Sequence, residues 1–438
     1  MPAEGHEVLE ARILEREAQV VVMGLGHVGL PLSVEFARAG FPVTGLEADP
    51  HRVARLQRGE SYVADVASSE VAALVRSGAL RVTGDVGVLA EAELVFICVP
   101  TPMSKTREPD LSYIWQAAET VARHLHEGML IVLESTTYPG TTEEVLLPRL
   151  RARGLEVDRD FYLAYSPERI DPGNRRYRLR DIPKLVGGVS PRSGDLAALA
   201  YRQIIPTVHV VSSARVAEMA KLLENTFRAV NIALANEFAL ICRALDVDVW
   251  EVIEAAATKP FGFMPFMPGP GIGGVCLPAN SGYLVWKARR HGIEPRLIGV
   301  AEEINRRMPH VAVEVIAEAL NARGKPVKGT RLLILGVAYK RDVGDVRESP
   351  ALTIIEELWR RGAQVVYSDP YVERLEIGGQ AVERVSVSAG TLAACEAAVI
   401  VTDHTAFDYR LIVEHAPLVV DLRNATRAFG ARTNVVRL

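Results

Sequence analysis

The chain has 438 residues, so at about 150 residues per domain we expect roughly three domains. Hydrophobic residues make up 49% and charged residues 24%, a balance typical of a globular protein that excludes a disordered chain or a coiled coil. The net charge of -4, and the lack of a signal segment or of a run of about 18 apolar residues, predict a cytoplasmic protein without nucleic-acid or membrane partners. We therefore expect a protein that acts on a small molecule.

The first part of the chain has the pattern of a nucleotide-binding fold. Between residues 19 and 49, an apolar run, a glycine turn, a helix-periodic stretch and a second apolar run form a βαβ pattern. Further apolar runs at 94–99, 129–133 and 161–164 alternate with helical stretches. Residues 1–205 are therefore predicted to form a doubly wound parallel sheet.

The middle of the chain is predicted to be helical. Residues 214–245 contain no proline or glycine, which indicates one helix much longer than usual. Shorter helical stretches follow at 249–258 and 296–323, separated by a loop at 259–274 that is dense in proline and glycine. Residues 206–325 are thus expected to form a central domain that joins other domains or dimerises.

The last part of the chain returns to alternating strands and helices. Apolar runs lie at 332–339, 364–370, 397–403 and 418–424, and Asp369 ends its strand much as Glu47 ends the second strand of the chain. Residues 326–438 are therefore predicted to form a second α/β domain. The predicted fold is two Rossmann-like doubly wound parallel-sheet domains joined by a long central helix and a helical middle domain.

A dinucleotide-binding motif follows the first strand. Gly24, Gly26 and Gly29 match G-x-G-x-x-G, with His27 and Val28 inside the turn, and glycines there let a pyrophosphate approach a helix N-terminus. Glu47 ends the second strand, where a carboxylate accepts the ribose hydroxyls and repels a 2′-phosphate, so NAD is favoured over NADP. Arg52 either faces the adenosine side of the cofactor or is a solvated arginine.

A lysine and an asparagine share one face of the long helix. Lys221 and Asn225 are four residues apart, so both can point at one substrate oxygen and stabilise negative charge on it. The alternative is a solvated lysine beside a surface amide. Other dehydrogenases use the same pair, so it does not identify the reaction.

One of the four cysteines is a candidate nucleophile. The four are far apart and form no Cys-x-x-Cys pair, so neither a disulfide framework nor a metal site is expected. Cys276 follows four glycines in the segment 269–274 and precedes a helical stretch, whose dipole would stabilise a thiolate. Cys98, Cys242 and Cys395 are expected to be packing residues.

The sequence resembles the nucleotide-sugar dehydrogenase family, the enzymes related to UDP-glucose and GDP-mannose dehydrogenases. The resemblance covers nearly the whole chain, and the loop KPFGFMPF at 259–266 is most similar to bacterial UDP-N-acetylglucosamine 6-dehydrogenases. Besides the glycine motifs, it includes VPTP at 99–102, ESTTYPGT at 134–141, SPE at 166–168, KLLEN at 221–225, GVAYKRDVGD at 336–345 and RESP at 347–350.

The resemblance implies a four-electron oxidation, dependent on NAD, of the C6 alcohol of a UDP-sugar to a carboxylate through a thioester on Cys276. The best-matched substrate is UDP-N-acetylglucosamine, with UDP-N-acetylmannosamine or UDP-glucose as alternatives. The product would be a precursor of surface polysaccharides. The resemblance also implies a homodimer or higher homo-oligomer.

It also implies roles for particular residues. Lys221 and Asn225 would hold the C6 oxygen, Thr136 would position water beside the nicotinamide, and Glu168 would serve hydrolysis as an acid or base while also binding substrate. Thr101 and Arg347 would contact the cofactor. The remaining residues that would bind the nucleotide sugar are Phe266, Gly273, Tyr339, Lys340 and Arg423.

Two positions depart from the family pattern next to the nucleophile. Val275 replaces a usual histidine, and Asn280 replaces a usual aspartate that assists proton removal, which an amide cannot do. Three explanations are open: Lys221 and Glu168 carry all the proton transfer, the enzyme turns over slowly, or the chain binds nucleotide sugars without full catalysis. A decarboxylating hydroxyacid dehydrogenase is a further enzyme alternative, and it would not need Cys276.

Overall fold

The computed structural model describes residues 4–63, 65–104, 108–171, 173, 177–274 and 276–438. It divides into two compact units: residues 1–224 with Gly282–Gly292, and Asn225–Ser281 with Ile293–Leu438. Each unit contains its own sheet. The division into three domains at residues 205 and 325 stays a prediction.

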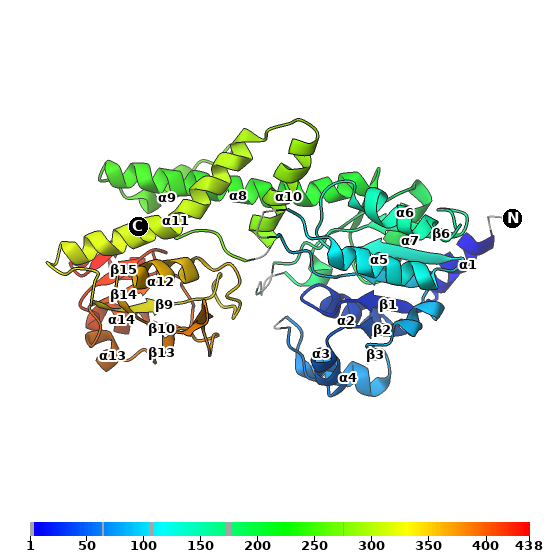
Figure 1. The fold of residues 1–438 in the computed structure, drawn as a ribbon, viewed down its shortest axis with the longest axis horizontal. Coiled ribbons are helices and arrows are strands. Elements are labelled where there is room, and N and C mark those ends of the chain that lie inside the picture. The colour runs from blue at the N-terminus through cyan, green and yellow to red at the C-terminus, as the bar shows by residue number, and fades with distance from the viewer. Residues whose placement is uncertain (1–3, 64, 105–107, 172, 174–176, 275) are drawn as a thin grey trace. The chain divides into compact units, whose positions relative to one another are not determined.

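The first unit is built on an eight-stranded sheet (Figure 1). The strand order is β3-β2-β1-β4-β5-β6-β7-β8, and neighbouring strands are parallel except β6 and β7, which are antiparallel. The strands are β1 (Val20–Met23), β2 (Val43–Leu46), β3 (Leu80–Thr83), β4 (Leu94–Ile97), β5 (Met129–Leu133), β6 (Phe161–Tyr165), β7 (Lys184–Gly188) and β8 (Val208–Val211). The predicted doubly wound sheet is confirmed, and β7 and β8 are strands that the sequence pattern did not reveal.

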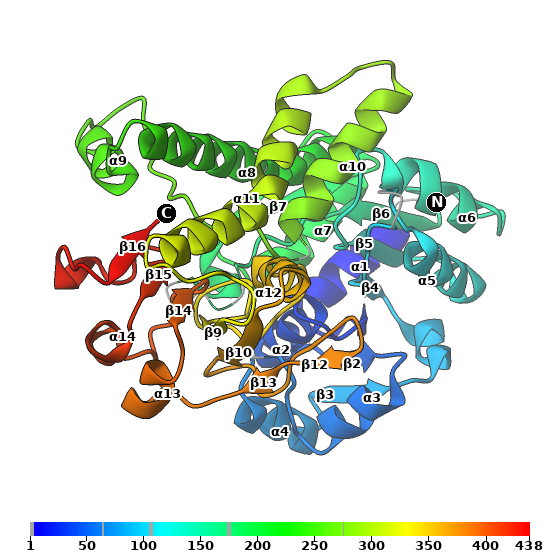
Figure 2. The same cartoon turned by 60° about the vertical axis from the view of Figure 1, so that its left-hand side comes forward.

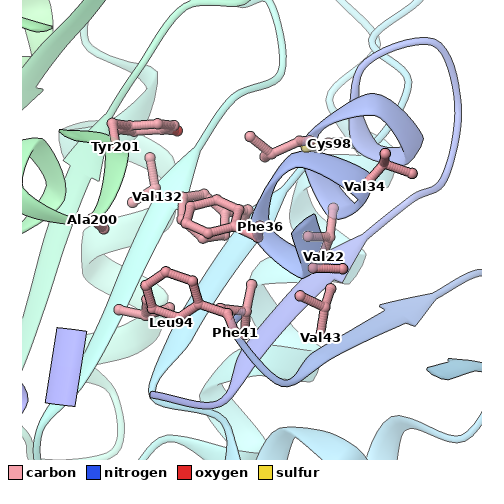
Figure 3. Packing of buried hydrophobic residues seen from close by; sticks show 14 of the residues in the cluster. Val22, Val34, Phe36, Phe41, Val43, Leu94, Cys98, Val132, Ala200 and Tyr201 are labelled. Carbon is pink, nitrogen blue, oxygen red and sulfur yellow. The ribbon is translucent and has the colours of Figure 1, made fainter. Parts of the chain in front are cut away.

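Helices cover both faces of this sheet, because right-handed crossovers on either side of the reversal between β1 and β4 place α2 and α5 on opposite faces. On one face, side chains of the sheet and of α1, α2 and α7 form a hydrophobic core (Figure 3). The ring of Phe36 on α2 lies 5.4 Å from that of Phe41 and 6.5 Å from that of Tyr201 on α7, measured between ring centres. The helices are α1 (Glu4–Leu14), α2 (Gly29–Ala39), α3 (Pro50–Gln57), α4 (Ser68–Ser77), α5 (Ser112–His124), α6 (Leu147–Arg151) and α7 (Pro191–Arg202).

The second unit is built on a six-stranded parallel sheet of order β13-β10-β9-β14-β15-β16. Side chains of β9 alternate between two cores: Leu332 and Ile334 pack with α11 and α12, which lie over the sheet in Figure 2, and Leu333 and Leu335 pack with α13 and α14. The strands are β9 (Arg331–Leu335), β10 (Gln364–Ser368), β13 (Glu383–Arg384), β14 (Ala397–Ile400), β15 (Val419–Asp421) and β16 (Val435–Arg437), beside a hairpin of β11 (Glu376–Ile377) and β12 (Gln380–Ala381). The helices are α9 (Val249–Ala257), α11 (Arg296–Asn321), α12 (Pro350–Arg360), α13 (Ala389–Ala393) and α14 (Tyr409–His415). This confirms the second predicted doubly wound sheet.

Two helices contribute residues to both units. The predicted long helix is α8 (Ala214–Ala244), with residues up to Glu224 in the first unit and the remainder in the second. Helix α10 (Cys276–Arg290) begins in the second unit and continues from Gly282 in the first. Across the described ranges, no helix is both long and apolar enough to span a bilayer.

Candidate active site

The glycine motif forms the tight turn between β1 and α2. A Cβ atom on Gly29 would overlap the carbonyl oxygen of Gly24, so only glycine fits at this crossing of two backbones. Val28, the N-cap residue of α2, has an apolar side chain that accepts no hydrogen bond from the N–H groups of the first turn. This arrangement leaves the first turn of α2 suited to an anion such as a pyrophosphate. His27 is exposed and Gly26 half-buried in the same turn.

Glu47 follows β2 and points back at this turn. Its buried carboxylate accepts hydrogen bonds from the backbone N–H of Leu25 at 3.0 Å and of Asp49 at 3.1 Å. Each carboxylate oxygen keeps a lone pair that can accept a ribose hydroxyl. Arg52 lies at the same place: its Nη1 is 3.9 Å from Glu47 Oε2, and its guanidinium lies 5.2 Å from the ring centre of Tyr62.

The carboxyl ends of β4, β5 and β6 place three predicted residues along one edge of the sheet. Thr101, Thr136 and Glu168 each follow one of these neighbouring parallel strands, where open α/β sheets bind ligands. Lys221 on α8 is 8% exposed, and its Nζ donates a hydrogen bond to the backbone carbonyl of Glu168. The first unit thus brings Lys221 and Glu168 together beside this edge.

A second residue of α8 binds the loop after β5. Glu218 is fully buried and accepts hydrogen bonds from the backbone N–H of Gly140 at 2.5 Å, the backbone N–H of Thr142 at 2.9 Å and the Thr142 hydroxyl at 2.7 Å. Burial raises the pKa of Glu218 to about 7, against the opposing effect of these donors. Because Lys221 is one helical turn away, Glu218 fixes the distance between that lysine and the loop of Thr136.

The C-terminal half of α10 is attached to the loops that follow β4 and β5. The Tyr283 hydroxyl donates to the carbonyl of Thr101 at 2.7 Å, and Trp286 packs on Tyr138 with ring centres 5.0 Å apart. Lys287 forms an ion pair with Glu144 at 2.7 Å. The part of α10 that belongs to the first unit is therefore fixed to these two loops.

The predicted nucleophile itself is only partly described. Cys276 is the first residue of α10, but its side chain and the whole of Val275 lie outside the described residues. Asn280, one turn further along α10, is fully buried. Neither its Nδ2 nor its Oδ1 has a hydrogen-bond partner among the described residues, which is unusual for a buried amide.

In the second unit, several of the predicted substrate residues lie around the glycine loop. A Cβ atom on Gly273 would lie 2.7 Å from Tyr339 Cβ and 2.7 Å from the Glu348 carbonyl oxygen, so this position tolerates no side chain without a shift. The backbone N–H of Gly274 donates to the carbonyl of Arg347 at 3.1 Å. Lys340 follows Tyr339 and is half-buried.

Two further predicted residues line the start and the approach of this loop. The guanidinium of Arg423 lies so close to Gly269 that a Cβ there would be 2.5 Å from its Nη1, and its Nε donates to the carbonyl of Val401 at 3.0 Å. Burial and the charge of Arg341 lower the pKa of Arg423 to about 10, so the group stays cationic at neutral pH. The ring of Phe266 packs against Phe227, whereas the exposed Arg347 pairs with Asp345 at 2.7 Å.

Asp369 follows β10 of the second sheet as Glu47 follows β2 of the first, but other groups of the protein already bind its carboxylate. Asp369 accepts from the backbone N–H of Val337 at 2.8 Å and of Ala338 at 3.1 Å, and its Oδ2 lies 2.9 Å from His404 Nε2. Burial alone would raise the pKa of Asp369, but the contacts with His404 and these N–H groups outweigh it and lower the pKa. The second unit therefore repeats the fold without repeating an open ribose site.

Four buried polar residues near the edge of the first sheet were not identified from the sequence: Glu134, Lys184, Tyr201 and Glu218. The local sequence gives little signal for Lys184 and Glu218, because another charged residue lies three positions from each of them. Among the described residues, no cluster of histidine, cysteine, aspartate or glutamate side chains could hold a metal ion.

Comparison with known proteins assigns the chain to a family. The profile described as the UDP-glucose/GDP-mannose dehydrogenase family, NAD binding domain, matches residues 18–205; the central-domain profile matches 215–307, and the UDP binding domain profile matches 333–428. The chain belongs to the UDP-glucose/GDP-mannose dehydrogenase family. This confirms the resemblance found in the sequence, the enzyme class as an NAD-dependent dehydrogenase and the cofactor as NAD.

Individual members of the UDP-glucose/GDP-mannose dehydrogenase family match most of the chain. A UDP-N-acetyl-D-glucosamine 6-dehydrogenase of Salmonella typhi is 36% identical over 363 residues, covering 82% of this chain and 84% of the relative. A UDP-N-acetyl-D-mannosamine dehydrogenase of Pyrococcus horikoshii is 37% identical over 393 residues, covering 89% and 90%. The solved structure of the UDP-D-ManNAc dehydrogenase from Pyrococcus horikoshii superposes with a TM-score of 0.87 at 33% identity, covering 96% of this chain and 98% of that one.

Proposed function

We propose that this protein oxidises the C6 hydroxymethyl group of a UDP-sugar, UDP-N-acetylglucosamine in the first instance, to a carboxylate in the cytoplasm. The product is a precursor of a surface polysaccharide. The observation that carries the proposal is the hydrogen bond from the buried Lys221 ammonium to the backbone carbonyl of Glu168, which brings this cation to the edge of the sheet where Thr101, Thr136 and Glu168 follow their strands. The alternative substrates are UDP-N-acetylmannosamine and UDP-glucose.

The first step removes a hydride and a proton from the C6 alcohol. Lys221 and Asn225 bind the C6 oxygen and stabilise the negative charge that develops on it. NAD, when bound, would supply the hydride acceptor, one molecule of it for each of the two oxidations. Glu47 holds the ribose hydroxyls, the turn of Gly24, Gly26 and Gly29 holds the pyrophosphate, and Thr101 and Arg347 complete the cofactor contacts.

The second oxidation needs a covalent adduct. The thiol of Cys276 adds across the C6 aldehyde to give a thiohemiacetal, which loses a hydride and a proton to become a thioester. Water, positioned by Thr136, then attacks the thioester and releases the carboxylate and the free thiol. Glu168 takes up the proton from this water, and Lys221 stabilises the oxyanion formed on the way.

The nucleotide end of the substrate is bound by the second unit. Tyr339 and Lys340 contact the diphosphate, and Arg423 adds a cation to that site. Gly273 lets the loop approach the sugar closely, and Phe266 packs at its edge. The UDP binding domain profile, which covers Tyr339, Lys340 and Arg423, supports this assignment of the nucleotide end.

One observation favours a second candidate function, a nucleotide-sugar-binding protein without full catalysis. The buried amide of Asn280 has no partner among the described residues and cannot take up a proton at neutral pH. Its two polar atoms would be satisfied by a bound ligand as well as by a reacting group. Retention of Cys276, Lys221, Thr136 and Glu168 favours the enzyme.

The test incubates the purified protein with NAD and a panel of UDP- and GDP-sugars, and follows NADH formation together with the mass of the sugar product. We expect NADH and a UDP-uronic acid, with the highest kcat/KM for UDP-N-acetylglucosamine. In Cys276→Ser the second oxidation is expected to be lost. Binding of nucleotide sugars without any NADH would refute the enzyme and support the binding protein, and an NADH yield that is unchanged in Cys276→Ser would favour the decarboxylating alternative.

We also propose that the protein is a homodimer assembled through α8. Seven apolar side chains, spaced three, four or seven residues apart along this helix, are between 44% and 65% exposed. One helix of a monomeric protein rarely leaves so much apolar surface in contact with water. They are Val216, Met219, Leu223, Phe227, Leu234, Phe238 and Ile241. The same face of a second copy would cover them.

A further inference from the structure

The loop that carries Tyr339 and Lys340 ends in an unusual backbone conformation. It follows β9 and includes Asp342, whose φ of 59° lies in the left-handed region that residues other than glycine rarely adopt. Such a conformation persists only where the surrounding structure holds it, and it is most frequent at functional sites. The contacts that hold Asp342 are therefore part of what gives this loop its shape.

His404, in the segment after β14, binds the backbone at this end of the loop. Its side chain is fully buried, and its Nδ1 lies 2.9 Å from the backbone nitrogen of Asp342. Because a backbone N–H can only donate, Nδ1 is the acceptor of this ring and Nε2 is its donor. The Nε2–H group donates to Asp369 Oδ2 at 2.9 Å. The imidazole thus forms a bridge between Asp342 and Asp369.

Asp369 binds the other end of the same loop. The oxygen that accepts from His404 also accepts from the backbone N–H of Val337 at 2.8 Å and of Ala338 at 3.1 Å. The Thr402 hydroxyl donates to the carbonyl of Ala338 at 2.6 Å. The two ends of the loop therefore converge on one pair of buried side chains, and the residues assigned to the diphosphate lie between these ends.

The carboxylate of Asp342 has separate partners at the surface. The exposed Thr405 donates its backbone N–H at 2.9 Å and its hydroxyl at 2.7 Å, and the exposed Tyr371 donates its hydroxyl at 3.3 Å. His404 therefore binds the backbone of Asp342 from the interior of the unit, where water does not compete for the hydrogen bond.

We propose that His404 is a positioning residue for the diphosphate of the UDP-sugar. By accepting from the N–H of Asp342 while donating to Asp369, it fixes the loop that presents Tyr339 and Lys340. The inference rests on the proposed function in assigning the diphosphate to these two residues, and His404 itself contacts neither substrate nor cofactor. A loop that is already ordered loses less conformational freedom on binding, so the effect is one on nucleotide affinity.

Two variants separate the two hydrogen bonds of His404. His404→Asn keeps an acceptor at the position of Nδ1 and loses the donor at Nε2, whereas His404→Gln keeps a donor at the position of Nε2 and loses the acceptor. Calorimetric titration with UDP measures the affinity. We expect Kd for UDP to rise by about tenfold in His404→Gln, where a buried N–H loses its acceptor, and to stay close to the wild-type value in His404→Asn.

Hydrogen–deuterium exchange of peptides that span 336–345 reports on the loop without any nucleotide. Exchange should be faster in His404→Gln than in the wild type or His404→Asn, because the N–H of Asp342 has lost its acceptor. His404→Met also lacks the acceptor but fills the buried space with an apolar side chain, so it should behave like His404→Gln if that variant does not fold. Circular dichroism checks the fold of each variant.

The matched control is His415→Gln, at an exposed histidine of α14, which should change neither the affinity for UDP nor the exchange of the loop. In turnover with NAD, the loss in His404→Gln should appear as a higher KM for the UDP-sugar with little change in kcat, since no reacting group has moved.

Equal affinities for UDP in the wild type and His404→Gln, or equal losses in His404→Asn and His404→Gln, would overturn the inference. A wild type that does not bind UDP would overturn it as well, because the loop would then have no diphosphate to bind. A wild type that binds UDP but forms no NADH would count against the proposed oxidation alone, since the titration and the exchange need no turnover.

Discussion

Asn280 differs from the expected aspartate by one side-chain atom. That difference separates the two candidate functions, a full enzyme and a nucleotide-sugar-binding protein. Its amide is buried without a partner among the described residues, at a position where the family usually carries an aspartate. An amide cannot accept a proton, so any proton transfer there has passed to other groups, of which Glu168 and Lys221 are already in contact.

Restoring the carboxylate tests which account is right. If Asn280 leaves the natural enzyme weakened, Asn280→Asp is expected to raise kcat by about a hundredfold, the lower end of the range for one acid or base group. The measurement is steady-state NADH formation with saturating UDP-sugar, and Asn280→Ala serves as the control for loss of the amide alone. An unchanged kcat in Asn280→Asp would show that Glu168 and Lys221 have replaced the role.

At the residue scale, motifs with a fixed spacing were predictable and contacts between distant segments were not. Gly24, Gly29 and Glu47 follow from one βαβ pattern, because the turn and the strand end lie within about thirty residues. The contact of Lys184 with Glu168 depends on the antiparallel course of β7, which no local pattern encodes. Roles such as those of Tyr339 and Arg423 came only from resemblance to a family.

At the scale of elements, the glycine loop 269–274 is held by close contacts against the segment of the second unit that runs from β9 to the start of α12. In Gly273→Ala the added Cβ would meet Tyr339 Cβ and the Glu348 carbonyl oxygen, each at 2.7 Å, and must push one of them away. Because Tyr339 is assigned to the diphosphate, we expect KM for the UDP-sugar to rise by about tenfold, the effect of roughly 1.4 kcal/mol, with little change in the affinity for NAD.

The matched control is Gly299→Ala, in α11, where an added Cβ has no atom within 4 Å. That variant should keep the wild-type KM and gain a little stability, since alanine is the better helix former. Equal KM values for Gly273→Ala and the wild type would mean that the loop does not shape the substrate site.

Helix α8 and the loop of Thr136 are joined by a titrating contact. The pKa of Glu218 is raised from its usual 4.5 to about 7, so the folded state binds this proton more tightly than the unfolded chain. The resulting stability is fully present below about pH 4.5 and is lost as the pH rises through 7, by at most about 3 kcal/mol. In Glu218→Gln this part of the pH dependence is expected to vanish.

The measurement is the difference in unfolding free energy between the wild type and Glu218→Gln, from urea titrations at several pH values between 4.5 and 8. Glu314→Gln, at an exposed glutamate of α11, controls for the general loss of one acid. Parallel curves for the wild type and Glu218→Gln would contradict the assignment.

Helices and strands could be predicted where their apolar residues form an uninterrupted run or a regular period. The long helix was expected at 214–245 and spans Ala214–Ala244, because no proline or glycine interrupts it. Strands β7 and β8 escaped prediction for physical reasons: β7 begins with a charged residue and ends in two glycines, and β8 is an edge strand with two exposed residues. Each lacks the continuous apolar run of a central strand.

At the scale of the whole molecule, the exposed apolar stripe of α8 predicts the oligomeric state. Light scattering should give the mass of a dimer for the wild type. In Leu234→Glu a charge replaces a side chain that is 50% exposed in a single copy, and the mass should fall to that of a monomer because an unpaired charge would be buried in the interface. Lys328→Glu, outside α8, should remain dimeric, and a monomeric wild type would contradict the dimer.

The central claim is that one thiol and one carboxylate turn an alcohol into an acid in two successive oxidations. The most direct measurement is the number of NADH molecules formed for each UDP-sugar consumed, followed to completion with limiting UDP-N-acetylglucosamine. The account predicts two NADH per sugar in the wild type and no more than one in Cys276→Ser. One NADH per sugar in the wild type, with an aldehyde or a keto sugar as the product, would contradict it.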